Sequence, residues 1–124
     1  MKILSKEIMS TEQIESETDY VLCEISPYGD GSKRYYNEKG EYHRENGPAV
    51  EYADGSKLWY INDKLHREDG PAEELYNDEM GWFINDQRHR EDGPAVKWVN
   101  GGEQFYLYDK VVDEETVRKL GKMK

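Results

Sequence analysis

The chain has 124 residues, of which 35% are hydrophobic and 35% are charged, and its formal net charge is -10. A domain of this length buries roughly two-thirds of its unfolded surface, so we expect one domain with a small core. The acidic balance disfavours direct binding to nucleic acids and to anionic membranes, because both require clustered Lys and Arg. No apolar run approaches the roughly 20 residues that span a bilayer.

The first residues and the single cysteine bear on the compartment. Residues 1–19 are acidic and contain no turn signals; we treat them as an N-terminal arm and leave strand, helix and disorder open. They do not resemble a secretion signal, in which a charged segment precedes an apolar one. Cys23 has no second cysteine with which to form an internal disulfide. Both features predict a cytoplasmic protein.

Residues 20–112 form a repeat domain. Three segments of the form His-Arg-Glu-Asp/Asn-Gly-Pro-Ala begin at His43, His66 and His89, at intervals of 23 residues. An earlier, partial unit matches the repeat if one inserted residue is allowed near Glu38 to Tyr42. The predicted units are about 20–42, 43–65, 66–88 and 89–111.

Each unit predicts a β-hairpin. Residues 48–52 alternate in polarity, residues 57–61 are aromatic and β-branched, and Asp54-Gly55 lies between them. Asn62-Asp63 and Asn85-Asp86 predict a second, left-handed turn. The expected fold is therefore mainly β, an antiparallel meander of hairpins. The glycines of the repeated motif are expected to supply unusual backbone dihedrals; they are Gly47, Gly70 and Gly93.

Because neighbouring residues of a strand point to opposite faces, the hairpins predict two columns of side chains. The predicted buried column is Val50, Tyr52, Trp59, Ile61, Leu75, Trp82, Ile84, Val96, Trp98, Phe105 and Leu107. The opposite face presents a row of rings among charges, made of Tyr36, Tyr60, Phe83 and Tyr106 with Glu51 and Glu74 beside them. Glu73 is a local exception, because it replaces the valines found at Val50 and Val96.

Residues 113–124 predict a short capping helix. Asp113 is a suitable N-cap, acidic residues come first and basic residues last, and Gly121 is a suitable stop. Val117 and Leu120 would give this helix an apolar stripe that closes the last hairpin. The ring row is then either exposed or covered by this helix or by the N-terminal arm.

The 23-residue unit, with an aromatic residue before Asn-Asp and then His-x-x-x-Gly-x-Ala-Val-x-Tyr-x-Asp-Gly, resembles the MORN repeat family from about Tyr28 to Val111. It is most similar to a His-Arg-Glu-Asp-Gly-Pro-Ala variant that recurs in bacteriophage and bacterial proteins. Two features depart from the ordinary pattern. Ala49, Ala72 and Ala95 replace a second glycine, and the acidic charge does not suit the lipid contacts proposed for basic members. The resemblance implies a scaffold for protein contacts.

The repeated histidines do not predict a metal site. With strands ~4.8 Å apart, equivalent histidines would lie on the order of 10 Å from one another, whereas zinc holds its nitrogen ligands at ~2.0–2.1 Å. We interpret the repeated side chains as framework, in which each His and Arg bonds to the turn or to the Glu and Asp of an adjoining unit; the Arg residues are Arg44, Arg67 and Arg90. Cys23 lacks the setting of a catalytic thiol, and no catalytic motif occurs. We expect no enzyme, cofactor or metal.

The leading functional hypothesis is a protein-interaction module that grips its partner with the ring row and the flanking carboxylates. The resemblance suggests a phage-encoded inhibitor of a host enzyme or defence complex, for example an anti-CRISPR-like protein acting in the host cytoplasm. One alternative is an acidic nucleic-acid mimic that blocks a DNA- or RNA-binding protein. Another is a structural or self-assembling virion component, a homo-oligomer that stacks through open sheet edges.

Overall fold

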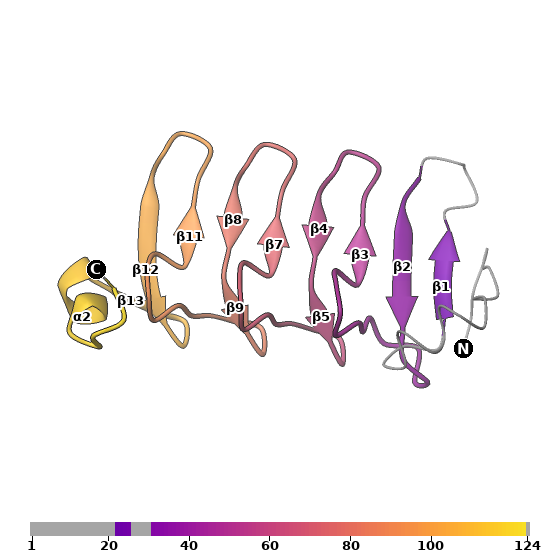
Figure 1. Ribbon diagram of the computed structural model, residues 1–124, viewed down its shortest axis with the longest axis horizontal. Helices are drawn as coiled ribbons and strands as arrows, with labels where there is room; N and C mark the ends of the chain where they lie inside the picture. The colour runs from indigo at the N-terminus through magenta and orange to yellow at the C-terminus, as the bar shows by residue number, and fades with distance from the viewer. Residues whose placement is uncertain (1–21, 26–30, 124) are drawn as a thin grey trace. The chain divides into compact units, whose positions relative to one another are not determined.

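The computed structural model describes residues 22–25 and 31–123; the predicted arm at 1–19 lies outside them. The chain divides after Lys64 into two compact units, and each is treated by itself. Both units consist of antiparallel hairpins, and a short helix follows the last strand (Figure 1). The expected mainly β hairpin fold with a C-terminal helix is confirmed.

The first unit contains a sheet in which strands adjacent in sequence pair with one another in the order β1-β2-β3-β4. A separate two-stranded hairpin of β5 and β6 follows. The strands are β1 (Leu22–Ile25), β2 (Lys33–Tyr36), β3 (Val50–Glu51), β4 (Lys57–Leu58), β5 (Tyr60–Ile61) and β6 (Lys64–Leu65).

The second unit repeats the arrangement. Its sheet runs in the order β7-β8-β11-β12-β13, and β9 pairs with β10 in a separate hairpin. The elements are β7 (Glu73–Glu74), β8 (Met80–Gly81), β9 (Phe83–Ile84), β10 (Gln87–Arg88), β11 (Val96–Lys97), β12 (Glu103–Leu107), β13 (Lys110–Val112) and α2 (Glu114–Arg118).

The turn between β3 and β4 has three residues. The N–H of Tyr52 donates to the carbonyl of Ser56 at 2.9 Å, and Gly55 adopts φ +95°, a conformation that glycine accepts without steric cost. Val50 consequently lies opposite Leu58, and Glu51 lies opposite Lys57. A two-residue turn would have shifted this register by one residue.

This register corrects the predicted column. Paired residues point to the same face of a sheet, so Val50 shares a face with Leu58 and Tyr60, whereas Trp59 lies on the opposite face with Glu51. The predicted column therefore mixed two faces. Four of its members are buried, namely Val50, Trp59, Val96 and Phe105. Five are half-buried, namely Ile61, Leu75, Trp82, Ile84 and Leu107. Tyr52 and Trp98, by contrast, are 41% and 42% exposed.

We call one face the tyrosine face, after Tyr60 and Tyr106, and the other the arginine face, after the arginines of the repeated loops that contact it. The tyrosine face contains Val50, Leu58 and Tyr60 in the first unit, and Glu73, Gly81, Phe83, Val96, Gln104 and Tyr106 in the second. The arginine face contains Glu51 and Trp59 in the first unit, and Glu74, Trp82, Lys97 and Phe105 in the second. Both faces contribute to the core, because Val50 and Val96 are buried on one and Trp59 and Phe105 on the other.

The second set of turns matches the expectation of left-handed residues. Asn62 and Asp63 have φ values of 47° and 71°, and Asn85 and Asp86 have 46° and 69°. The turn aspartates also join neighbouring hairpins: Asp63 Oδ1 accepts from the N–H of Tyr42 at 3.0 Å. In the partial unit a longer turn ends at Gly40, with φ +81°. It lies where the sequence predicted an inserted residue.

The C-terminal helix α2 begins as predicted. Asp113 is its N-cap and accepts from the N–H of Thr116 at 2.8 Å. Val117 is fully buried, but Leu120 is 45% exposed, so the apolar stripe consists of Val117 alone. Among the described residues, no helix has both the length and the apolar character needed to cross a membrane.

Candidate interaction surfaces

The repeated arginines close the loops in which they lie. Arg67 donates from Nη1 to the carbonyl of Pro71 at 3.0 Å and from Nε to Asp69 at 3.1 Å. Arg90 makes the same bonds to Pro94 at 3.1 Å and Asp92 at 2.8 Å. Charge-assisted hydrogen bonds of this kind fix loop geometry. The arginines thus bond within their own loops; the carboxylate partners belong to the same loop and not, as the sequence had predicted, to an adjoining unit.

The motif glycines are needed for a different reason from the one predicted. Gly47, Gly70 and Gly93 are not among the residues with positive φ, so the prediction of unusual dihedrals was wrong. Instead, a Cβ atom would lie 3.1, 2.9 and 2.7 Å, respectively, from the guanidinium carbon of the arginine in the same loop. The arginine side chain covers the glycine, and a larger residue there would have to displace the guanidinium.

The histidines bond to turns. The Nδ1 atom of His43 accepts from the N–H of Asn62 at 3.0 Å, and His89 accepts from Tyr108 at 3.0 Å. His66 makes the equivalent bond to Asn85 at 3.1 Å. Each Nε2 atom faces a glutamate of its own loop. No group of His, Cys, Asp and Glu in the described part of the chain has the arrangement of a metal site.

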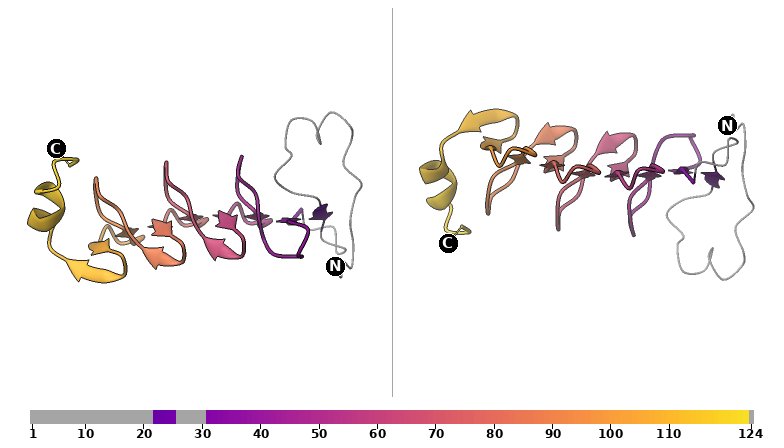
Figure 2. Two further views of the ribbon diagram at one scale, coloured as in Figure 1. Left: turned by 90° about the horizontal axis from the view of Figure 1, so that it is seen from below. Right: turned by 90° about the horizontal axis from the view of Figure 1, so that it is seen from above.

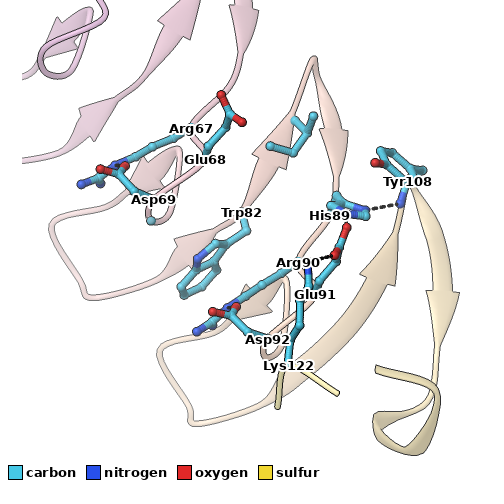
Figure 3. Close-up of a pocket in the computed structure, with 12 residues that line it drawn as sticks. Arg67, Glu68, Asp69, Trp82, His89, Arg90, Glu91, Asp92, Tyr108 and Lys122 are labelled. Atoms are coloured by element: carbon cyan, nitrogen blue, oxygen red, sulfur yellow. Dashed lines mark hydrogen bonds and ion pairs between the residues drawn. The ribbon is translucent and has the colours of Figure 1, made fainter. Parts of the chain in front are cut away.

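An open groove of about 760 Å³ lies on the arginine face of the second unit (Figure 3). Trp82 lies between the loop that carries Arg67 and the loop that carries Arg90. The guanidinium of Arg90 lies 4.0 Å from the Trp82 ring centroid. Trp82 therefore gives the groove an aromatic surface between the two arginine loops.

The charges of this groove are largely paired with one another. Besides the two Arg–Asp pairs, Lys122 Nζ donates to Glu91 Oε1 at 2.6 Å, and Glu91 also accepts from His89 at 2.9 Å. The hydrogen bonds from Lys122 and His89 lower the pKa of Glu91. The groove thus offers few unpaired charges to a ligand.

On the tyrosine face, the first unit holds a stack of three rings. The ring centroids of Tyr36 and Tyr42 are 5.4 Å apart, and those of Tyr42 and Tyr60 are 5.2 Å apart. All three rings are half-buried. The hydroxyl of Tyr36 donates to Glu24 at 3.1 Å, and burial with this carboxylate raises the Tyr36 pKa. The sequence prediction included Tyr36 and Tyr60 but missed Tyr42, which lies directly before the repeated His.

In the second unit, an arginine takes the place of the middle ring. The guanidinium carbon of Arg88 lies 5.5 Å from the ring centroids of both Phe83 and Tyr106. Tyr106 is half-buried, but Phe83 is only 8% exposed. The prediction of Phe83 as an exposed contact residue was therefore wrong. Gly81, two residues earlier on the same face, leaves space for the Phe83 ring to lie against the strand.

The carboxylates predicted to flank the ring row lie on the other face. Glu51 pairs with Lys57 in register, and Glu74 with Met80, which places both glutamates on the arginine face. Glu51 lies 3.6 Å from Arg44, and Glu74 lies 3.5 Å from Arg67. The ring row and these two acids do not form one surface, because the three-residue turn separates them.

The predicted cover for the ring row is only partly described. Helix α2 follows β13 and lies at the end of the second unit, beyond its last strand, in each of the views (Figures 1 and 2). Tyr106 keeps part of its surface exposed. The N-terminal arm lies outside the described residues.

Cys23 lies in the core of the first unit and is 4% exposed. Burial raises the pKa of its thiol, which outweighs the opposing effects of a hydrogen bond with Tyr35 and of nearby cations. A buried thiol that remains protonated is a poor nucleophile. The geometry of Cys23 thus favours packing over chemistry.

Comparison of the chain with protein-family models, with curated proteins and with solved structures gives no match. The resemblance to the MORN repeat family therefore rests on the repeated motif itself.

Proposed function

We propose that the chain is a non-enzymatic protein-interaction module that contacts its partner through the tyrosine face. The observation that supports this is the stack of Tyr36, Tyr42 and Tyr60, whose half-buried rings hold one another in place. Tyrosines lose little conformational entropy on binding when they are already ordered, and they are common among the residues that dominate binding energy. Arg88 and Tyr106 provide a similar pair in the second unit.

The partner is proposed to be a host enzyme or a defence complex, with the chain acting as a phage-encoded inhibitor in the host cytoplasm. This part rests on the MORN-like motif, on the small size and on the net charge of -10. An acidic surface accelerates association with a basic protein partner.

The test is affinity capture from bacterial lysate with the tagged chain and three variants. Tyr42→Ala and Tyr60→Ala remove rings from the stack, whereas Tyr76→Ala removes a ring that is 69% exposed and lies outside the stack. We expect a stoichiometric partner with the wild type and with Tyr76→Ala, and strong loss with the two stack variants. Failure to recover any stoichiometric partner would count against the proposal.

The two alternatives make different predictions. A nucleic-acid mimic needs accessible acids, but Glu51 and Glu74 are engaged with Arg44 and Arg67, which weakens their part in that model. If charge reversal at other exposed acids abolished capture while Tyr60→Ala did not, the mimic would be favoured. A self-assembling component would form oligomers, which size-exclusion chromatography with light scattering detects; a strict monomer would oppose it.

A further inference from the structure

One hairpin departs from the repeat at two facing positions. Glu73 lies opposite Gly81 in register. In the first unit the same positions hold Val50 opposite Leu58, and the next hairpin has Val96 opposite Gln104. A purely structural repeat has no need of a carboxylate and a glycine on the tyrosine face, so this pair of departures points to a special role.

These two positions lie at an open hollow of about 130 Å³, whose lining includes Glu73, Gly81 and Trp98 together with the charged residues Glu79, Arg88 and Lys97. A Cβ atom on Gly81 would lie 2.9 Å from Glu73 Oε1 and 2.9 Å from Phe83 Cε1. The glycine therefore makes room for the carboxylate and for the Phe83 ring. Trp98, which is 42% exposed, adds an accessible ring to the lining.

The Glu73 carboxylate lies in this hollow without a donor. Within the described residues it makes no hydrogen bond and no ion pair, and its burial raises its pKa against a smaller opposing effect of Arg88. A half-buried carboxylate that no donor reaches is unfavourable, because it has lost hydration and the charge of Arg88 offsets only part of that loss. A donor brought by another molecule would remove this penalty.

The other charged groups around the hollow are occupied. Arg88 lies between the rings of Phe83 and Tyr106, at 5.5 Å from each centroid. Lys97 points to the arginine face, where its Nζ lies 5.7 Å from the Trp82 ring centroid. Glu79 accepts from the N–H of Val99 at 3.4 Å. Among the charged groups of the hollow, Glu73 is thus the one with no hydrogen bond, ion pair or ring contact within the described residues, although the charge of Arg88 acts on it.

We propose that the hollow binds an arginine side chain of the partner protein, with the guanidinium on the Glu73 carboxylate and against the Trp98 ring. Guanidinium groups donate in a planar fork that matches a carboxylate, and they stack on aromatic faces. The net charge of -10 favours a basic partner. This inference rests on the proposed function and names the chemistry of the partner's contact.

The test uses N-acetyl-argininamide as the probe and N-acetyl-citrullinamide as its neutral analogue. In an NMR titration we expect a saturable shift of the Trp98 indole N–H with the arginine compound and a far weaker response with citrulline. Glu73→Gln should weaken binding by about ten-fold or more, since it removes the charge that a guanidinium requires. Glu114→Gln, on helix α2 and outside the hollow, is the matched control and should bind as the wild type does. Equal binding of citrulline, or unchanged binding by Glu73→Gln, would overturn the proposal.

A second variant separates this proposal from the broader one. Glu73→Val installs the residue that the equivalent positions Val50 and Val96 already accommodate, and removes the carboxylate from the hollow. We expect it to lose probe binding and to capture less partner from lysate. If it retained the partner while Tyr60→Ala lost it, the interaction module would stand and the arginine site would be wrong.

Discussion

The arginine face and the tyrosine face of the hairpins repeat to different degrees. On the arginine face the same bond from Arg to a proline carbonyl recurs at 3.3, 3.0 and 3.1 Å in successive loops. On the tyrosine face the residue before the repeated His is Tyr42 in one hairpin and Arg88 in another, and Leu58, Gly81 and Gln104 occupy equivalent positions. Recurring contacts indicate framework, and varied side chains on the same framework indicate recognition.

The largest effect should come from breaking the framework. Arg90→Ala removes bonds to Pro94 and Asp92 and a ring contact with Trp82, and we expect a loss of about 2–3 kcal/mol in the free energy of unfolding. Urea denaturation measures it. Arg118→Ala removes an exposed ion pair with Glu114 and serves as the control, with little effect. Equal stability of the two variants would contradict the framework role.

The next effect comes from the glycines beneath the arginines. Gly93→Ala should lower the free energy of unfolding by about 1–2 kcal/mol, because its Cβ would displace the Arg90 guanidinium. Gly47→Ala should have a smaller effect, since the corresponding distance is 3.1 Å rather than 2.7 Å. Denaturant midpoints of the two variants test the order. A larger loss for Gly47→Ala would mean that backbone conformation, not crowding, selects these glycines.

The sequence predicted the arginine face better than the tyrosine face, and the reason is geometric. Motifs such as His-Arg-Glu-Asp-Gly-Pro-Ala act within one loop or between adjacent turns, so their roles follow from local spacing. The identity of each face depends instead on whether a turn has two or three residues, and Asp54-Gly55 suits both. The position of Phe83 depends further on the space left by Gly81. A periodic sequence pattern does not reveal that space.

A smaller change, an increase in the free energy of unfolding, is expected from a substitution on the tyrosine face. Burial raises the Glu73 pKa above its ordinary value of 4.5, so the folded state holds this proton more tightly than the unfolded state does. Stability attributable to Glu73 is thus greatest at low pH and falls as pH rises through the folded pKa. Glu73→Gln should therefore be more stable than the wild type at neutral pH, by about 1 kcal/mol, and the difference should shrink below pH 4.5. Thermal unfolding across pH checks this; a constant difference would show that charge is not the cause.

The smallest effect concerns Lys122, whose exposed ion pair with Glu91 should add little to stability because water and salt screen it. Its influence should appear in titration instead. The hydrogen bond from Lys122 is the largest cause of the lowered Glu91 pKa, so Lys122→Ala should move that pKa upward, toward 4.5. Asp113, whose pKa is lowered by Thr116, should titrate unchanged in the same NMR experiment. The pair would then be a local contact, and loss of Lys122 would leave the arginine loops folded while opening one side of the groove. A parallel change at Asp113 would instead indicate that the tail supports the whole end of the second unit.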